Sequence, residues 1–269
     1  MMRCAVVGDP VEHSLSPAIH RAGYRAHGLD WDYEAIQVRG GKLPEFISSL
    51  GEPGEWSGLS VTAPHKQDLL KLGEPDSISR MVQGGNTIVF DSPARVYNTD
   101  VPGFVRAWRN RGLDTLSTAV IVGNGATARS LLVALSGLSV RQVMVLAREP
   151  ARAMKLCELG VALSIEVTAQ PLDVSVPDVD LLASTVPVSA TTTRAEAWAE
   201  RAGVLFDAVY DPWPTPIAKA ASPGQPVITG LELLAGQAVD QFRLLTGCEL
   251  GFQEALSAAV AELEARRNS

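Results

Sequence analysis

A short apolar run that stops at two glycines constrains the fold of this chain more than any other stretch. Residues 119–122 read Ala-Val-Ile-Val, and Gly123-Asn124-Gly125 follows directly. The run is rich in β-branched residues and is too short for a buried helix, so it predicts a strand. Leucines at positions 131, 132, 135 and 138 then recur at helical spacing. The stretch is expected to fold as a strand, a tight turn and a helix.

The small residues of this turn fit the G-x-G-x-x-G/A fingerprint of a dinucleotide-binding turn, with Gly123 first, Gly125 second and Ala128 third. The first glycine allows the turn, the second lets a pyrophosphate approach the backbone, and the third residue lets the helix pack closely. A turn built only for packing gives the same pattern, but a second strand-like run at residues 143–146 completes a βαβ unit. Backbone N–H groups at the helix start would hold the phosphates. The cofactor-binding residues expected here are Gly123, Asn124, Gly125, Ala126 and Thr127.

The composition is that of an ordinary globular protein and excludes several classes of partner. Of 269 residues, 46% are hydrophobic and 20% charged, which allows one large or two modest domains. The formal charge of −7 argues against a nucleic-acid or anionic-membrane surface. No run approaches a membrane span, and the apolar start breaks at Gly8-Asp9-Pro10, too early for a signal peptide. The expected partner is a small molecule.

Cysteine and histidine usage predicts neither a disulfide framework nor a metal site. Cys4, Cys157 and Cys248 are odd in number and widely spaced, which fits a reducing cytoplasm. The four histidines lie on different expected elements without the spacing of metal ligands.

An alternation of expected strands and helices precedes the glycine turn and predicts a separate α/β domain. Its expected strands are residues 4–7, 31–38, 58–62, 87–90 and 95–97, and its helices are 17–27, 43–50 and 67–72. After a connecting helix at 101–111, the second domain is expected to continue with strands at 165–168, 180–185, 204–209 and 226–229. Two long helical patterns, 231–245 and 252–266, have no strand after them and are expected to return to the first domain.

Three polar clusters lie at the ends of expected strands in the first domain, where open α/β sheets place their ligands. They are residues 13–17, residues 60–66, and residues 86–87 with 98–100. A lysine opposite an aspartate in such a cleft, here Lys66 and Asp100, can pass a proton to a substrate oxygen while the carboxylate orients the ammonium. The alternative is that both side chains are solvated surface charges.

In order and spacing, these clusters resemble the motifs of the shikimate dehydrogenase family, and the resemblance spans nearly the whole chain. The family's G-x-P-x-x-H-S-x-S-P corresponds to residues 8–17, N-V-T-x-P-x-K to 60–66, G-A-x-N-T, slightly altered, to 84–87, and N-T-D-x-x-G to 98–103. Two later matches lie at residues 207–216 and 230–238. The departure is Ser60, where the family usually has Asn. Because serine is shorter and leaves one contact to water or to a neighbour, Ser60 is not expected in the site.

The resemblance implies an α/β fold of two domains and an oxidoreductase activity. Residues 1–102 with 232–269 would form the substrate-binding and catalytic α/β domain, and residues 103–231 a Rossmann-type, doubly wound NADP-binding domain, with the C-terminal helices returning to the first. The implied reaction is the NADPH-dependent, reversible reduction of 3-dehydroshikimate to shikimate. It is a cytoplasmic step toward chorismate and the aromatic amino acids.

Carried over residue by residue, the resemblance implies that Lys66 and Asp100 are the catalytic pair and also contact the substrate. The other substrate-binding residues would be Ser14, Ser16 and Tyr210 for the carboxylate, and Thr62, Asn86 and Gln237 for the ring hydroxyls. Hydroxyl and amide groups suit this task because they pair donors and acceptors with a polyol. On the cofactor side the resemblance adds Thr185, beside the nicotinamide, and Gly230.

The residues after the second strand of the glycine-turn unit favour NADP over NAD. An NAD enzyme usually has an acidic residue there for the ribose 2′-OH, whereas an arginine accommodates the 2′-phosphate of NADP. Arg148 matches the arginine of the family's N-R-T motif, and Arg152 follows four residues later. Two guanidinium groups can hold a dianionic phosphate through charge-assisted bonds. Glu149, where the family often has Thr, is expected to point outward or to pair with an arginine.

Three alternatives stay open at this point. The first is a quinate/shikimate dehydrogenase that prefers NAD, because Glu149 lies in the ribose-binding window. The second is a catalytically silent dinucleotide sensor, for which the lysine and aspartate would be superfluous. The third is an S-adenosylmethionine methyltransferase, which a glycine turn alone would suit. In each case the partners are small molecules rather than nucleic acid or membrane, and the chain is expected to be a monomer or a homodimer.

Overall fold

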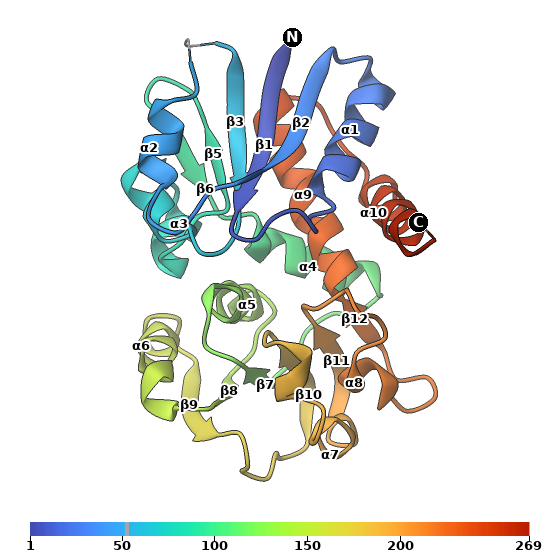
Figure 1. The fold of residues 1–269 in the computed structure, drawn as a ribbon. Helices are drawn as coiled ribbons and strands as arrows, with labels where there is room; N and C mark the ends of the chain where they lie inside the picture. Colours follow the sequence, from blue (N-terminus) through green and yellow to red (C-terminus); the bar gives the residue numbers. More distant parts are fainter. Residues whose placement is uncertain (52–53, 269) are drawn as a thin grey trace. The chain divides into compact units, whose positions relative to one another are not determined.

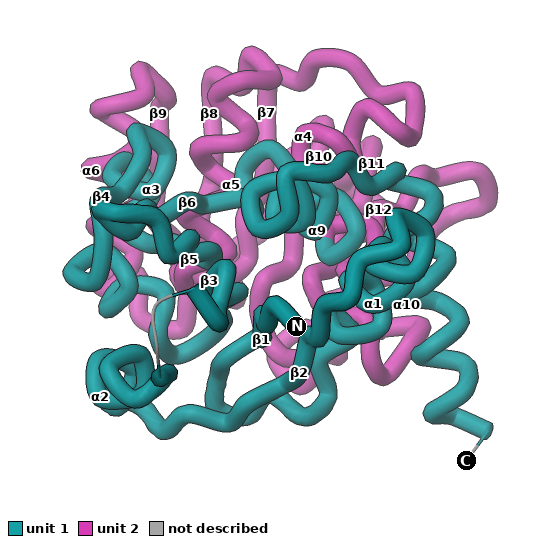
Figure 2. Tube along the Cα trace, turned by 90° about the horizontal axis from the view of Figure 1, so that it is seen from above, with its two compact units in different colours: residues 1–103, 234–269 teal, residues 104–233 magenta. Residues whose placement is uncertain are grey.

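The computed structural model describes residues 1–51 and 54–268, which form two compact units (Figures 1 and 2). Unit 1 comprises Met1–Gly103 with Leu234–Ser269, and unit 2 comprises Phe104–Leu233. The chain passes between the units inside two helices, α4 (Asp100–Asn110) and α9 (Gly230–Thr246). The sequence-based boundaries, after residues 102 and 231, differ slightly from these, because a boundary inside a helix has no turn residue to mark it.

Unit 1 is built on a mixed six-stranded sheet with the order β2-β1-β3-β5-β6-β4. The strands are β1 (Met2–Gly8), β2 (Trp31–Gln37), β3 (Trp56–Val61), β4 (Glu74–Pro75), β5 (Thr87–Val89) and β6 (Arg95–Tyr97). Strand β1 runs parallel to β2 and β3, whereas β5 runs antiparallel to both β3 and β6. The carboxyl ends of β1 and β3 therefore meet at one edge of the sheet, where the first two polar clusters begin.

Helices cover both faces of this sheet. Figure 1 shows α1, α9 and α10 on one side and α2 on the other. The helices are α1 (Ser16–His27), α2 (Leu43–Ser48), α3 (Ser77–Val82) and α10 (Phe252–Arg267), with a 3-10 helix at Asp68–Lys71. Leu43 of α2 packs with Val7 and Leu59 on one face, while His20 of α1 stacks on Tyr33 of β2 on the other, with ring centroids 4.1 Å apart.

Unit 2 contains a fully parallel six-stranded sheet with the order β12-β11-β10-β7-β8-β9. Its strands are β7 (Thr118–Val122), β8 (Gln142–Ala147), β9 (Glu166–Pro171), β10 (Val179–Ser184), β11 (Ala202–Asp207) and β12 (Val227–Thr229). Its helices, besides α4, are α5 (Ala126–Ser136), α6 (Met154–Ala162), α7 (Ala195–Ala199) and α8 (Pro216–Lys219), with 3-10 helices at Pro150–Ala153 and Val188–Ala190. The strand order reverses between β7 and β10, the switch point at which doubly wound sheets bind ligands.

The strand, turn and helix expected around the glycines are present as β7, residues 123–125 and α5. The helix ends at Ser136, so Leu138 lies beyond it, contrary to the expected spacing. Leu138 is nevertheless buried, because the turn after α5 folds it back onto the unit. None of the helices in the described part of the chain is long and apolar enough to cross a membrane.

Candidate active site

Lys66 and Asp100, 34 residues apart in sequence, form an ion pair in unit 1. Lys66 lies on the turn that follows β3, and Asp100 is the first residue of α4. The Lys66 Nζ atom donates to Asp100 Oδ2 at 2.6 Å, and the two side chains are only 14% and 10% exposed. They are therefore not solvated surface charges. Partial burial strengthens the attraction between the charges and fixes the direction in which the ammonium group points.

Asn86 holds the second oxygen of the Asp100 carboxylate. Its Nδ2 atom donates to Asp100 Oδ1 at 3.0 Å and to Thr99 Oγ1 at 2.9 Å. Its Oδ1 atom accepts from the backbone N–H of Thr99 at 2.8 Å. Gln237 of α9 reaches the same cluster, with its Oε1 atom 3.4 Å from Asn86 Nδ2. Four of the expected site residues, Lys66, Asn86, Asp100 and Gln237, thus lie in one hydrogen-bonded network.

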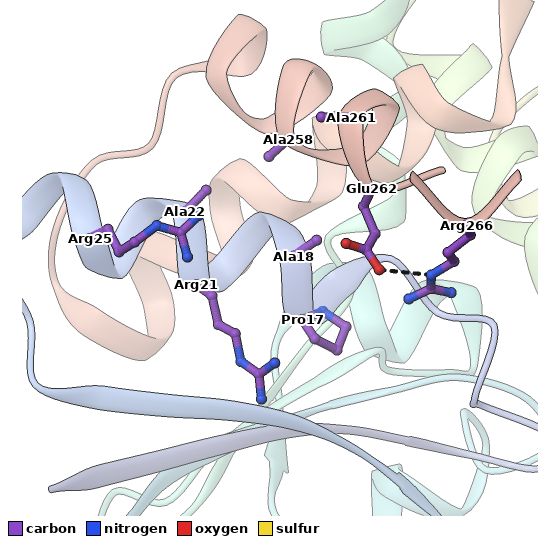
Figure 3. A pocket seen from close by; sticks show the side chains of 9 residues that line it. All are labelled: Pro17, Ala18, Arg21, Ala22, Arg25, Ala258, Ala261, Glu262 and Arg266. Atoms are coloured by element: carbon purple, nitrogen blue, oxygen red, sulfur yellow. Dashed lines mark hydrogen bonds and ion pairs between the residues drawn. The ribbon is translucent and has the colours of Figure 1, made fainter. Parts of the chain in front are cut away.

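Ser14 and Ser16 lie on a tight turn and at the start of α1. The Ser14 N–H donates to Val11 O at 2.9 Å, and Ser14 Oγ accepts from the Ser16 N–H at 3.3 Å. Arg266 of α10 holds this turn from outside, donating to the carbonyl oxygens of His13 and Ser14 at 3.0 and 3.1 Å. Figure 3 shows Arg266 paired with Glu262 at one end of the groove between α1 and α10. The turn that carries Ser14 is therefore fixed from two sides.

Thr62 and Tyr210 lie on loops that follow strands of different units. Thr62 follows β3 in unit 1 and is half-buried, with its backbone paired to Val7 and His65. Tyr210 belongs to unit 2, in the loop after β11. That loop is shaped by the buried Asp207, which accepts from the Val209 N–H at 3.1 Å. Burial raises the pKa of the Asp207 carboxyl, and a hydrogen bond from Thr215 opposes the rise.

The start of α5 in unit 2 fits a pyrophosphate. Gly125 is the N-cap, and no side chain caps the helix. The first hydrogen bond within the helix is that of the Arg129 N–H to Gly125 O, so the N–H groups of Ala126 and Thr127 have no partner within the helix. A Cβ atom on Gly125 would meet nothing within 4 Å, which leaves open space at these donors.

Gly123 has a separate reason to be glycine. Its φ is +114°, and a Cβ atom there would lie 2.4 Å from Thr185 Oγ1. Thr185 in turn donates to Val122 O at 2.8 Å and closes the end of β10 against β7. The expected cofactor residues Gly123 and Thr185 are thus in contact at the switch point of the sheet.

A pocket of about 390 Å³ continues from this turn along the end of β8. Its lining includes Gly123, Asn124, Arg148, Glu149 and Arg152. Glu149 pairs with Arg152 at 2.8 Å, as expected from their mixed charges. Arg148 is exposed at the end of β8, and no ion pair engages it within the described residues. The pocket therefore presents one free guanidinium and one that is already balanced by a carboxylate.

Gly230, expected on the cofactor side, has a clear packing role. A Cβ atom at this position would lie 2.2 Å from the carbonyl oxygen of Ala208, so the start of α9 approaches the backbone after β11 closely.

Sequence reasoning missed five residues that connect to the network: Tyr33, Ser60, Thr87, Thr99 and Gln241. Thr99 lies inside a motif that supplied Asp100, and Gln241 lies one helical turn after Gln237 on the same face of α9. Thr99 and Gln241 could therefore have been predicted from the sequence. Tyr33 could not, because its contact with Ser60 joins strands 27 residues apart.

Comparisons with known proteins give consistent results. A family model described as "Shikimate dehydrogenase substrate binding domain" matches residues 6–88. The chain is 34% identical over 252 residues to shikimate dehydrogenase (NADP(+)) of Natronomonas pharaonis, covering 90% of this chain and 92% of that protein.

Solved structures extend the similarity to the fold. The crystal structure of Mycobacterium tuberculosis shikimate dehydrogenase is 34% identical, with a TM-score of 0.89, and the match covers 97% of this chain and all of the other (100%). The Thermus thermophilus enzyme in complex with NADP(H) and shikimate is 30% identical, with a TM-score of 0.85 and coverage of 97% and 99%.

Proposed function

Since the chain belongs to the shikimate dehydrogenase family, we propose that it catalyses the reversible, NADPH-dependent reduction of 3-dehydroshikimate to shikimate. The observation that carries the proposal is the partly buried Lys66–Asp100 pair held by Asn86. A catalytically silent sensor has no use for an oriented ammonium group in a polar cluster. A glycine turn for S-adenosylmethionine would not account for that cluster either.

Lys66 is the proton donor in this proposal. When bound, the reduced nicotinamide supplies a hydride to the carbonyl carbon of the substrate. The Lys66 ammonium gives a proton to the carbonyl oxygen, which becomes the new hydroxyl, and the amine then regains a proton from water. Asp100 keeps Nζ in place through the 2.6 Å contact. In the reverse direction the neutral amine removes the hydroxyl proton.

The other polar residues that the family motifs share are assigned to the substrate. Ser14 and Ser16, on the turn that Arg266 holds, and Tyr210 of unit 2 are assigned to the carboxylate. Thr62, Asn86 and Gln237 are assigned to the ring hydroxyls. The network supports this because the two amide side chains already meet at the catalytic pair.

Unit 2 binds the cofactor in this proposal. The N–H groups at the start of α5 hold the pyrophosphate, because a helix N-terminus favours anions. Arg148 binds the 2′-phosphate with a contribution from Arg152, and Thr185 with Gly230 completes the set of contacts. We place the enzyme in the cytoplasm, with two small molecules as its partners, as a monomer or a homodimer.

The test is oxidation of shikimate with NADP, followed at the absorbance of the reduced nicotinamide. The unmutated protein is expected to be active, and Lys66→Ala is expected to lower kcat by at least about 100-fold, the lower bound for a general acid–base group. Circular dichroism should be unchanged, because Lys66 lies on a turn outside the core. A well-folded Lys66→Ala enzyme with near-normal kcat would remove Lys66 from the mechanism.

A further inference from the structure

A chain of buried hydrogen bonds runs from β2 to the catalytic pair. The Tyr33 hydroxyl donates to Ser60 Oγ at 2.6 Å, and Ser60 Oγ donates to Gln241 Oε1 at 3.0 Å. Gln241 Nε2 donates to Asn86 O and to Thr87 Oγ1, both at 3.0 Å. Thr87 Oγ1 donates to Asn86 Oδ1 at 3.1 Å. We call Tyr33, Ser60, Gln241, Thr87 and Asn86 the relay.

Backbone groups fix the direction of every bond in the relay. Because Asn86 O is a carbonyl, it can only accept, so the NH₂ group of Gln241 must face Asn86 and its oxygen must face Ser60. Ser60 must then donate to Gln241, and the Tyr33 hydroxyl must donate to Ser60. At the other end, the Thr99 N–H fixes the oxygen of Asn86, so the Asn86 NH₂ group faces Asp100.

All members of the relay are removed from water. Tyr33 and Thr87 are 0% exposed, and Ser60, Gln241 and Asn86 are 2–3% exposed. A buried donor or acceptor that loses its partner costs about 1–3 kcal/mol, since no water replaces that partner. A buried network that is fully satisfied therefore holds its members in one arrangement.

Ser60 is occupied by this arrangement. Its single proton goes to Gln241 and its oxygen accepts from Tyr33, so it has no hydrogen left to donate to a ligand. In the family motif this position is usually Asn, which carries an NH₂ group. In this chain the amide that donates to the Asn86 carbonyl is that of Gln241 of α9.

Building on the proposed function, we propose that Tyr33, Ser60 and Gln241 are positioning residues of the active site. Their hydrogen bonds lead to Asn86 rather than to Lys66, and they act by fixing the backbone and side chain of Asn86. Asn86 in turn orients the carboxylate that holds the Lys66 ammonium.

The first experiment compares Tyr33→Phe with Tyr24→Phe. Both tyrosines are almost fully buried and belong to one aromatic cluster with His20. The Tyr24 hydroxyl lies beside the Cys4 thiol and outside the relay. Tyr33→Phe should lower kcat for shikimate oxidation by roughly 2- to 13-fold, the worth of one net hydrogen bond, without changing KM for NADP. Tyr24→Phe should leave kcat unchanged.

The second experiment exchanges the two positions. Ser60→Asn alone inserts a longer side chain between Tyr33 and Gln241, and Gln241→Ala alone removes the amide, so each should lower kcat/KM for shikimate. The double variant Ser60→Asn/Gln241→Ala should have a higher kcat/KM for shikimate than either single variant. The effects of contacting residues in one network are not additive. A double variant whose kcat/KM equals the product of the two single effects would show that Ser60 and Gln241 act independently, and would overturn their coupling in the relay.

An NMR measurement that does not depend on catalysis tests the relay separately from the proposed function. The side-chain amide signals of Asn86 in an NMR spectrum should move in Tyr33→Phe and stay in place in Tyr24→Phe. Unmoved signals together with an unchanged kcat in Tyr33→Phe would overturn the relay, even if Lys66→Ala is inactive. A fully active Lys66→Ala enzyme would overturn the assigned chemistry, while the amide signals would still decide on the relay.

Discussion

Arg148 is the residue on which cofactor choice depends. It is exposed in the unit 2 pocket, whereas Arg152 is paired with Glu149. A hydrogen bond to a charged group contributes about 1.5–3 kcal/mol, so Arg148→Ala should weaken NADPH binding by roughly 10- to 150-fold. Fluorescence titration with NADPH measures this, and kcat should change little because the adenosine end lies far from the hydride.

Arg152→Ala is the matched control for this variant. Because the Arg152 guanidinium already pairs with Glu149, Arg152→Ala should weaken NADPH binding less than Arg148→Ala does. An unmutated enzyme that used NADH as efficiently as NADPH would contradict the role of Arg148. Glu149 would then become the candidate for the ribose 2′-OH.

His20 should make the protein sensitive to acid. Burial lowers the pKa of His20 from its ordinary 6.5 to about 3, and a weaker interaction with Gln241 opposes the fall. Below pH 6.5 the unfolded chain gains a proton that the folded protein does not accept until about pH 3. The contribution of His20 to the free energy of unfolding is therefore fully present above pH 6.5. As the pH falls from 6.5 toward 3, this contribution decreases by about 1.4 kcal/mol per pH unit.

Urea denaturation at pH 7, 6 and 5 measures how the free energy of unfolding changes with pH. His20→Phe, which keeps an aromatic ring against Tyr33, should flatten this slope. His13→Gln, at an exposed position, controls for the loss of a histidine. A His20→Phe protein with the slope of the unmutated chain would contradict the assignment.

At the residue level, the sequence predicted the residues of the motifs but not the hydrogen bonds between them. The sequence pairs Lys66 with Asp100 because both follow expected strand ends and both match family motifs, although 34 residues separate them. The tie between Tyr33 and Ser60 depends on the register of β1 with β2 and β3, which only the folded sheet defines. The shorter side chain of Ser60 is the reason the sequence analysis does not expect it in the site, and the structure gives it two hydrogen-bond partners.

The contact of α9 with the start of α4 decides where Gln237 lies. A Cβ atom on Gly236 would be 2.3 Å from Gly103 O, and one on Gly103 would be 2.6 Å from the Gln237 nitrogen. Gly236→Ala must push the helices apart at a cost of about 1–3 kcal/mol. It should lower Tm and raise KM for shikimate, as measured by thermal denaturation and initial rates.

Gly251→Ala serves as its control, because the nearest atom to a Cβ there is 3.7 Å away, within ordinary contact distance. It should leave KM for shikimate unchanged. A Gly236→Ala enzyme with normal KM would show that Gln237 does not depend on this close approach.

At the level of elements, the strands were predictable except the two-residue β4, and several helices were not. The doubly wound sheet of unit 2 and the mixed α/β unit 1 confirm the expected fold class. The sequence missed α3, which has only six residues and depends on its Asp76 cap. It also missed α6, whose Gly160 reads as a helix breaker. That glycine is needed because a Cβ atom there would lie 2.2 Å from Val167.

The two units should differ in their ability to fold alone. Unit 2 is continuous in sequence and has its own sheet and core around Leu182, Leu205 and Trp198. Residues 1–103 lack α9, whose Phe242 packs against Tyr24 with ring centroids 5.7 Å apart. We expect isolated residues 104–233 to unfold cooperatively on heating and isolated residues 1–103 to show no such transition. Cooperative unfolding of 1–103 would show that its sheet needs no C-terminal helix.

Discontinuity of unit 1 also has a consequence for biosynthesis on the ribosome. Residues 104–233 leave the exit tunnel before residues 234–269, although the latter belong to the first unit. Unit 2 can therefore complete its sheet while the aromatic face of His20, Tyr24 and Tyr33 still lacks Phe242. Such transiently exposed apolar surface is prone to aggregation. A chaperone that binds apolar surface is therefore expected to engage residues 1–103 of the nascent chain until α9 emerges.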